Sequence, residues 1–220
     1  MATILITGAN RGIGLSFAKL LQARGDHVIA ACRRETPELA ELGVEVASDV
    51  DVSREKSINL LAEKLAGRSL DVLINNAGLL ESDRLTELDF AAIQRQIEVN
   101  AYGPLRVTQK LAKNLARGAK VALITSRMGS IADNSSGGMY GYRMSKAALN
   151  AAGKSLALDL APHGVAVAIL HPGYVKTDMT DRHGTVLPDD AARDLLQRIE
   201  ELTLQNSGTF WHANGSVLPW

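Results

Sequence analysis

"TILITGANRGIGLSFAKLL", residues 3–21, decides the fold of this chain. Its first five residues form a short β-rich apolar run, typical of a strand that is buried on both faces. Gly8, Gly12 and Gly14 then form a turn, and the residues that follow have apolar side chains at helical spacing. Backbone N–H groups at such a helix start, together with the helix dipole, favour an anion. The stretch therefore predicts a phosphate-binding strand–turn–helix unit, with glycines that only close a tight turn as the alternative.

Similar apolar runs and helical patterns alternate along the rest of the chain. Apolar runs occur at 27–31, 44–47, 70–74, 120–125 and 165–170, and 208–212 adds a candidate edge strand. Helical patterns occur at 12–24, 53–66, 85–98, 101–117, 142–161 and 189–204. Strand–helix alternation implies parallel pairing with right-handed crossovers. We therefore predict an α/β fold, a doubly wound parallel sheet of the Rossmann type with helices on both faces, in a single domain spanning 1–220.

Composition excludes several classes of protein. The 46% hydrophobic content of the 220 residues fits one domain with a real core. Lys+Arg and Asp+Glu both number 24, so no net positive field exists to hold nucleic acid or an anionic membrane. The N-terminus has no basic segment and too short an apolar run for a signal peptide, and the lone Cys32 excludes an intrachain disulfide, so we expect a cytoplasmic location. None of the five histidines has a spacing suited to metal, and we expect no metal site.

Two tyrosines and one lysine stand close together in "GMYGYRMSKAALN", residues 138–150. Residues four apart on a helix share a face, about 6 Å apart along the axis, so Tyr142 and Lys146 can address one ligand while Tyr140 points elsewhere. A Tyr-x-x-x-Lys pair also occurs on ordinary helices, where the lysine is solvated and the tyrosine packs. Other motifs must therefore support a catalytic role for this pair.

Five motifs in order carry a resemblance to a known family. They are "TGANRGIG" at 7–14, "NNAG" at 75–78, "TS" at 125–126, "YRMSK" at 142–146 and "HPGYVKTDM" at 171–179. With them the chain resembles the short-chain dehydrogenase/reductase family, in its compact form, over most of its length. The stretches "VALITSRMGSI" and "GGMYGYRMSKAALN" and the ending "GSVLPW" are most similar to the C-factor and sniffer-type carbonyl reductase branch.

The resemblance implies an oxidoreductase that transfers a hydride between NADPH and a carbonyl or alcohol substrate. It makes Tyr142 the acid/base, Lys146 its electrostatic partner, Ser126 the hydroxyl that orients the carbonyl, and Asn100 the fourth member, which helps to retain a water linked to the lysine. The chemistry agrees, because a phenol titrates near pKa 10 and needs positive charge to stabilise its phenolate at neutral pH. No metal is then required.

Alternatives remain for two of these positions. Asn100 can be the N-cap of the predicted 101–117 helix, a common use of asparagine. Ser126 can be a strand-end hydroxyl tied to backbone, and Ser130 is the competing serine. Tyr140 is expected to pack or to line the substrate pocket.

The resemblance also implies the contacts of the cofactor. Asp49 and Val50 follow the third predicted strand and are expected at the adenine, with Asp51 as the rival aspartate. The full set of expected cofactor-binding residues is Gly8, Asn10, Arg11, Gly12, Ile13, Gly14, Arg33, Asp49, Val50, Asn76, Ala77, Gly78, Tyr142, Lys146, Pro172, Gly173, Val175 and Thr177.

The residues after the second predicted strand favour NADPH over NADH. A site selective for NADH commonly places a carboxylate at that strand end, to bind the ribose 2′-hydroxyl. Here Cys32 occupies the position and Arg33 and Arg34 follow, with Arg11 in the glycine turn nearby. Guanidinium groups can hold a 2′-phosphate through charge-assisted hydrogen bonds. Solvated arginines, with Glu35 approaching the ribose, are the alternative.

Substrate and partners are less defined by the sequence. The segment 178–188 that precedes the last helix is short, so we expect an open pocket that accepts varied small carbonyls. An NAD(P)-binding signalling or sensing protein with little turnover is the alternative function, because fold alone does not determine chemistry. The family often pairs its long helices between subunits, and the alanine-rich 147–157 face leads us to expect a homodimer.

Overall fold

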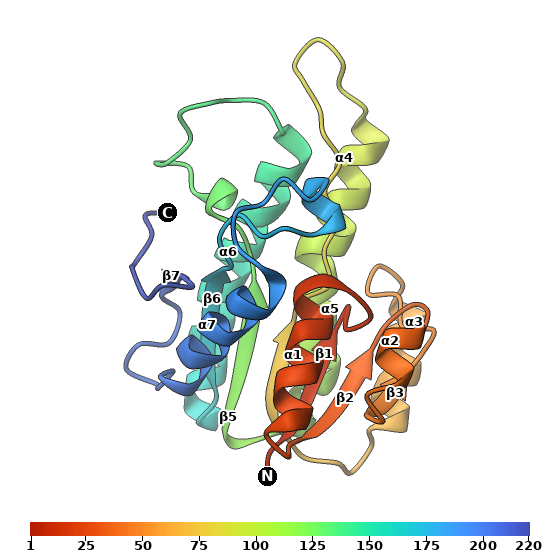
Figure 1. Ribbon diagram of the computed structural model, residues 1–220. Coiled ribbons are helices and arrows are strands. Elements are labelled where there is room, and N and C mark those ends of the chain that lie inside the picture. Colours follow the sequence, from red (N-terminus) through yellow and green to blue (C-terminus); the bar gives the residue numbers. More distant parts are fainter.

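A seven-stranded parallel sheet forms the centre of the computed structural model, which describes residues 1–220 (Figure 1). The strands are β1 (Thr3–Thr7), β2 (His27–Ala31), β3 (Glu45–Ala47), β4 (Leu70–Asn75), β5 (Leu115–Ile124), β6 (Ala166–His171) and β7 (Phe210–His212). They are hydrogen-bonded in the order β3-β2-β1-β4-β5-β6-β7, and every pair is parallel. The predicted doubly wound sheet, with its last edge strand, is confirmed.

Helices cover both faces of the sheet (Figure 1). They are α1 (Gly12–Ala23), α2 (Pro37–Ala40), α3 (Glu55–Lys64), α4 (Phe90–Ile97), α5 (Gly103–Leu111), α6 (Tyr140–Leu160) and α7 (Pro188–Glu200). Helices α1 and α7 lie together in front of the sheet in this view, and α5 and α6 lie behind it. None of the helices has the length and apolar run needed to cross a bilayer.

Strand β1 shows how one strand serves two cores. Ile4 and Ile6 are buried in the hydrophobic cluster that contains Phe17 of α1 and Leu195 of α7. The residue between them, Leu5, is buried in the opposite cluster, which contains side chains of α3, α5 and α6. Successive side chains of a strand point to opposite faces, so a continuous apolar run is what a strand covered on both sides requires.

The predicted helix over 101–117 is wrong at its second half. Helix α5 ends at Leu111, and β5 begins at Leu115 and pairs there with Leu70 of β4. Between them, the Asn114 side chain donates hydrogen bonds to the carbonyls of Leu65 (2.7 Å) and Arg68 (2.8 Å). Helix propensity in this alanine- and lysine-rich stretch is therefore overridden by pairing and by this tertiary contact.

The predicted helix over 85–98 starts late, at Phe90. Asp89 is its N-cap, and its carboxylate accepts hydrogen bonds from the N–H groups of Ala91 (2.9 Å) and Ala92 (3.2 Å). A π-helical turn, Glu98–Tyr102, then joins α4 to α5. Residues 79–88 form the loop that rises above α4 at the top of Figure 1.

Because all strands are parallel, their carboxyl ends meet at one edge of the sheet, where open α/β folds bind ligands. The loops that follow β1, β4, β5 and β6 gather at this edge, in the upper half of Figure 1. These loops, together with the start of α6, carry the motifs singled out in the sequence, so the fold brings the predicted site residues to one end of the molecule.

Candidate active site

Tyr142 and Lys146 lie on the same face of α6, as their spacing predicts. The Lys146 ammonium is 5.7 Å from the centroid of the Tyr142 ring. Both side chains are buried, 7% and 4% exposed. Tyr140 is the first residue of α6, two positions before Tyr142, so it lies on another side of the helix.

Burial changes how both groups titrate. Burial raises the pKa of Tyr142 to about 12, and its interaction with the Ser126 side chain only partly opposes this. The phenol therefore keeps its proton at neutral pH and is available as a donor. Burial lowers the pKa of Lys146 to about 8, so the ammonium is charged at neutral pH but loses its proton readily above it.

Lys146 is held in place from the sheet side. Its ammonium donates a hydrogen bond of 2.9 Å to the carbonyl of Ile124, the last residue of β5. Behind it, the buried Thr125 hydroxyl donates to the Asn150 side-chain oxygen at 2.7 Å. The end of β5 and the middle of α6 are thereby joined next to the predicted reacting groups.

The serine whose side chain interacts with Tyr142 is Ser126 and not Ser130. Ser126 follows β5 directly, and its buried hydroxyl oxygen accepts the N–H of Met128 at 3.1 Å. The Ser130 hydroxyl instead accepts the N–H of Asp133 at 3.1 Å and so stabilises the next turn of the loop. Ser126 is the serine whose side chain influences the titration of Tyr142.

Asn100 is fully buried in the π-helical turn between α4 and α5. Its side-chain oxygen accepts the Leu79 N–H at 2.7 Å, and its amide donates to the Leu79 carbonyl (2.7 Å) and the Ser145 hydroxyl (2.9 Å). The Ser145 hydroxyl in turn donates to the Tyr142 carbonyl at 2.8 Å. The N-cap alternative is wrong, because the helical run continues through Asn100 and its side chain contacts no first-turn N–H group.

The glycine turn is closed by contacts within the protein. A Cβ atom on Gly8, whose φ is +67°, would lie 2.9 Å from the Ala77 Cα atom, and one on Gly14 would lie 2.1 Å from the Gly8 oxygen. The Asn76 amide donates to the carbonyls of Thr7 and Gly8, at 3.1 Å each. Tight packing therefore explains two of the three glycines, and anion binding must be judged from the helix start that follows.

The start of α1 has the chemistry of a phosphate site. Its N-cap, Arg11, makes no capping hydrogen bond, and its first turn contains no acidic residue. The N–H groups of Gly12, Ile13 and Gly14 therefore meet no side-chain acceptor at the positive end of a twelve-residue helix. Thr177, from the loop after β6, lies beside the turn, 3.3 Å from where a Gly12 Cβ would be.

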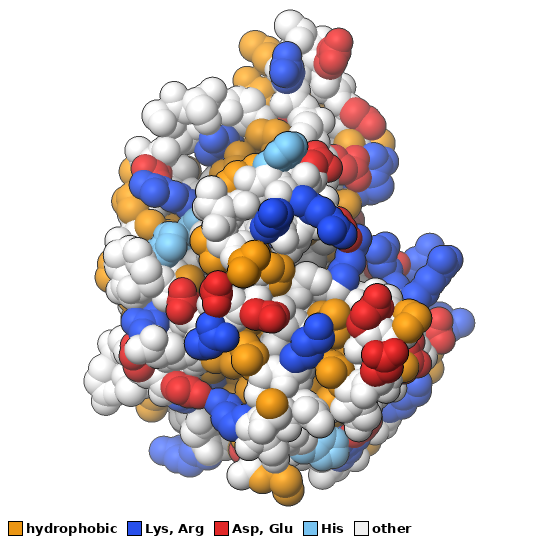
Figure 2. Space-filling model, in the orientation of Figure 1, with side chains coloured by type: hydrophobic (Ala, Val, Ile, Leu, Met, Phe, Trp, Pro, Cys, Tyr) orange, Lys and Arg blue, Asp and Glu red, His pale blue; other side chains and the backbone are white.

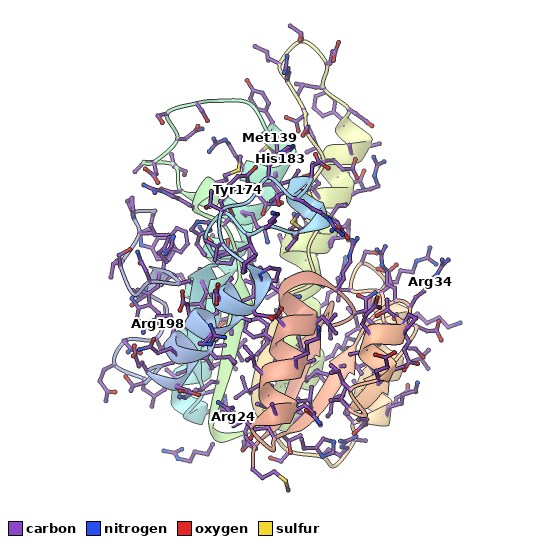
Figure 3. The ribbon with its side chains drawn as sticks, viewed as in Figure 1. Arg24, Arg34, Met139, Tyr174, His183 and Arg198 are labelled. Carbon is purple, nitrogen blue, oxygen red and sulfur yellow. The ribbon has the colours of Figure 1, made fainter.

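The glycine turn also contacts the segment after β2. The Asn10 side chain donates to the Arg34 carbonyl at 3.0 Å, and the Thr36 hydroxyl donates to the Asn10 carbonyl at 3.0 Å. Cys32 is buried whereas Arg33 and Arg34 are exposed. Basic side chains gather on the right of Figure 2, at the level where Figure 3 labels Arg34.

Arg11, the other predicted arginine, faces the loop after β6. Its guanidinium lies 3.9 Å from the Asp178 carboxylate, and both side chains are exposed. Asp178 also pairs with Arg182 at 3.2 Å. Arg11 therefore reaches toward the 178–188 segment in this structure, and Arg33 and Arg34 are the arginines next to the end of β2.

Of the two candidate aspartates after β3, only Asp49 is free of side-chain partners. Asp51 accepts hydrogen bonds from the N–H (3.0 Å) and the hydroxyl (2.7 Å) of Ser53 and pairs with Arg54 at 3.6 Å. Asp49 has a left-handed backbone, with φ of 62°, and the next residue, Val50, is buried with its N–H on the Cys32 carbonyl (2.9 Å). The geometry favours Asp49 and Val50 over Asp51.

The loop after β6 folds back on itself. Val175 forms a bridge with Val186, and the Lys176 N–H donates to the Val186 carbonyl at 2.8 Å. The N–H groups of Thr185 and Val186 both bond to the Tyr174 carbonyl. Figure 3 shows Met139, at the start of α6, and Tyr174 and His183, from this loop, at the same end of the molecule. Pro172 and Gly173, the first residues of this loop, are partly buried.

Two features of the site were not anticipated from the sequence. The rings of His171 and His212 meet edge to face, with their centroids 5.0 Å apart. The pKa of His171 is lowered to about 3, mainly by burial and further by the nearby charges of His212, Arg127 and Lys146. Asp83, from the loop after β4, accepts N–H groups at the start of α6.

No group of three or more His, Cys, Asp or Glu side chains is placed to hold a metal ion.

The family model of the short chain dehydrogenases matches residues 2–186 of this chain. The chain belongs to the short-chain dehydrogenase family. A family relative named 1-hydroxy-2-glutathionyl-2-methyl-3-butene dehydrogenase, from Rhodococcus sp. (strain AD45), is 43% identical over the whole of both chains. Another, named C-signal, from Myxococcus xanthus, is 46% identical over 69% of this chain and 93% of its own.

Solved structures of short-chain dehydrogenases superpose over the full chain. The carbonyl reductase Sniffer of D. melanogaster matches with a TM-score of 0.93 and 30% identity, covering 100% of both chains. The NADPH-bound carbonyl reductase from chicken fatty liver matches with a TM-score of 0.89 and 30% identity, covering 100% of this chain and 99% of its own. These likenesses confirm the resemblance to the C-factor and sniffer-type branch.

Proposed function

We propose that this protein is an NADPH-dependent carbonyl reductase in which Tyr142 is the acid/base. The observation that carries the proposal is the buried, protonated Tyr142 phenol with the Lys146 ammonium 5.7 Å from its ring and Ser126 beside it. The carbonyl reductases among its structural relatives, one of them bound to NADPH, support the same reaction.

The cofactor fits the residues present at the sheet edge. The open start of α1 accepts the phosphates of the cofactor, as helix starts commonly do. Arg33 takes the 2′-phosphate, with Arg11 as a second cation that must first leave Asp178. The other proposed contacts are the turn residues Gly8, Asn10, Gly12, Ile13 and Gly14, then Asp49, Val50, Asn76, Ala77 and Gly78, and finally Pro172, Gly173, Val175 and Thr177.

The reaction then divides between cofactor and protein. Bound NADPH supplies the hydride that reaches the carbonyl carbon. Tyr142 donates its phenolic proton to the substrate oxygen as negative charge develops there, and the Ser126 hydroxyl donates a second hydrogen bond to the same oxygen. The Lys146 charge stabilises the phenolate that remains, and each unit by which it lowers the phenol pKa corresponds to about 1.4 kcal/mol.

Asn100 keeps its proposed place as the fourth member. Both hydrogens of its amide are already used, by Leu79 and Ser145, so the side chain acts by holding the loop after β4 against α6. The water relay to Lys146 that the family resemblance implies stays a prediction.

Turnover of a substrate panel tests the proposal. NADPH oxidation is measured with aldehydes, quinones, diketones and ketoesters, and NADP⁺ reduction with an alcohol that carries a glutathione conjugate, the class named for the Rhodococcus relative. We expect activity with several small carbonyls, because the 178–188 segment is short. A strong preference for one large substrate would contradict the open pocket.

The second candidate function is NAD(P)-dependent signalling or sensing with little turnover. The 46% identity to the relative named C-signal is the observation that favours it. Tight NADPH binding without turnover of any member of the panel would support this function over the reductase.

A homodimer in solution also stays a prediction, and light scattering tests it.

A further inference from the structure

Helix α6 carries Tyr142 and Lys146 but contains no N-cap of its own. The residue before it, Met139, makes no capping hydrogen bond and has a left-handed backbone, with φ of +54°. In the residues 135–139, "SSGGM", the Ser136 hydroxyl accepts a hydrogen bond from the Arg143 side chain at 2.9 Å, and no side chain of the segment accepts a first-turn N–H of the helix. The first N–H groups of the helix therefore need an acceptor from elsewhere in the chain.

Asp83 supplies that acceptor from the loop after β4. Its carboxylate accepts the N–H of Tyr140 at 2.5 Å and that of Gly141 at 2.8 Å, and its backbone carbonyl accepts the N–H of Met139 at 3.1 Å. The side chain is buried, with 9% of the residue exposed. Three successive N–H groups at the start of α6 are thus bound by one residue that precedes them by more than fifty positions.

The segment that carries Asp83 is anchored at alternate residues. Leu79 is bound through both backbone groups to the Asn100 side chain, at 2.7 Å each. The Glu81 N–H donates to the side-chain oxygen of the buried Gln96 at 3.0 Å. Residues 79–83 therefore form a fixed strap that runs from Gly78, an expected cofactor contact, to the start of α6.

The strap meets α6 where there is no space for adjustment. A Cβ atom on Gly141 would lie 2.5 Å from the Gln96 amide nitrogen and 3.1 Å from the Ile93 Cα atom. The first turn of α6 is consequently pressed against α4 on one side and bound by Asp83 at its end. Tyr142 is the residue directly after Gly141, so its position depends on this turn.

We propose that Asp83 is a positioning residue for Tyr142. By binding the first-turn N–H groups, it keeps Tyr142 in register with Ser126 and Lys146. This inference rests on the proposed function, because it concerns the residue to which the proton donation is assigned. It assigns no contact between Asp83 and substrate or cofactor.

The test compares Asp83→Ala and Asp83→Asn with a matched control, Asp89→Ala. Asp89 caps α4 through the same kind of contact, two N–H groups on one carboxylate, but belongs to no part of the proposed site. We expect Asp83→Ala to lower kcat by roughly 10- to 100-fold, because small misplacements of reacting groups have effects of that size. KM and the NADPH dissociation constant should change by less than about threefold, and Asp89→Ala should keep kcat.

Asp83→Asn retains one acceptor oxygen, so it should recover part of the kcat that Asp83→Ala loses. Hydrogen exchange of residues 140–146 is measured on all variants and needs no turnover. Faster exchange there in Asp83→Ala, but not in Asp89→Ala, together with the loss of kcat, supports the inference. An unchanged kcat in Asp83→Ala, or an equal loss in Asp89→Ala, would overturn it. If the wild-type protein reduces no carbonyl, the proposed function fails, and unchanged exchange in Asp83→Ala would overturn the positioning role separately.

Discussion

The starts of α1 and α6 lie at the same end of the sheet and differ in what occupies them. Neither helix is capped by its own N-cap residue, Arg11 in α1 and Met139 in α6. The first turn of α1 contains no acidic residue and makes no capping hydrogen bond, whereas that of α6 is bound by the Asp83 carboxylate. At both starts the first N–H groups have no partner within their own helix, and the helix dipole adds partial positive charge. One is left open to a ligand anion, and the other is closed by an anion of the protein.

Helix α4 provides the reference for this comparison. Its N-cap, Asp89, is local and exposed, and it binds N–H groups two and three residues further along. A local cap stabilises a helix but does not relate it to any other element. Asp83, in contrast, ties α6 to the loop after β4. The three helix starts therefore differ in role. The cap of α4 stabilises the helix alone, the contact with Asp83 fixes the position of α6, and the start of α1 is open to a ligand.

The largest effect is expected at the closed start, from Tyr142→Phe. The variant has no phenolic proton to give to the substrate oxygen, so kcat should fall by about 100-fold or more. NADPH affinity should remain, because the proposed phosphate site at α1 is untouched. The matched control is Tyr140→Phe, which should keep most of the turnover. Steady-state kinetics decide between the two tyrosines, and a dead Tyr140→Phe with an active Tyr142→Phe would refute the assignment.

A smaller effect is expected beside the open start, at the end of β2. Arg33→Ala should lower kcat/KM with NADPH by roughly 10- to 100-fold and leave NADH nearly unchanged, because a charge-assisted contact to the 2′-phosphate is lost. Cys32→Asp should weaken NADPH further through repulsion of that phosphate. Both cofactors are compared on each variant. Equal use of NADPH and NADH by the wild type, or a preference that survives both substitutions, would refute the role given to these residues.

The open start of α1 is tested by adding a carboxylate there, as Asp83 provides one at the start of α6. Arg11→Asp places a capping carboxylate at the N-cap, which should raise the stability of the helix by about 1 kcal/mol. The same carboxylate repels the cofactor phosphates, so NADPH and NADH should both bind about tenfold more weakly, roughly 1.4 kcal/mol. Arg11→Asn provides the cap without the charge and is the control. Equal cofactor affinity in the Asp and Asn variants would show that the helix start does not hold the phosphates.

The fold and the shared face of Tyr142 and Lys146 on α6 could be predicted from local patterns. Apolar runs such as 3–7 and the four-residue spacing of Tyr142 and Lys146 are set by sequence neighbours, and the structure reproduces them. The end of α5 could not be predicted, because strand pairing at Leu115 outweighs local helix propensity. Asp83 was missed for a related reason. The uncapped start of α6 signals that an acceptor is needed, but only the fold shows which distant residue provides it.

The smallest predicted effect is a dependence of the reduction rate on pH. It arises from groups on α6, whereas NADPH binding at the start of α1 should not share it. Burial lowers the pKa of Lys146 to about 8, while burial raises that of Tyr142 to about 12. Between pH 6 and pH 10 the phenol should therefore keep its proton, and the lysine should lose its charge. The rate of carbonyl reduction should fall to about half its plateau near pH 8, because the phenolate left by proton donation loses its stabilising cation.

Lys146→Arg isolates this cause, since a guanidinium stays charged over the whole range. The variant should have a lower plateau, because the guanidinium does not fit the place of the ammonium on the Ile124 carbonyl, but no decline near pH 8. The profiles of kcat at saturating NADPH provide the measurement, and NADPH affinity at each pH is the control for the open start at α1. A decline that persists unchanged in Lys146→Arg would assign the titration to a group other than Lys146 and would remove the lysine from the electrostatic role proposed for it.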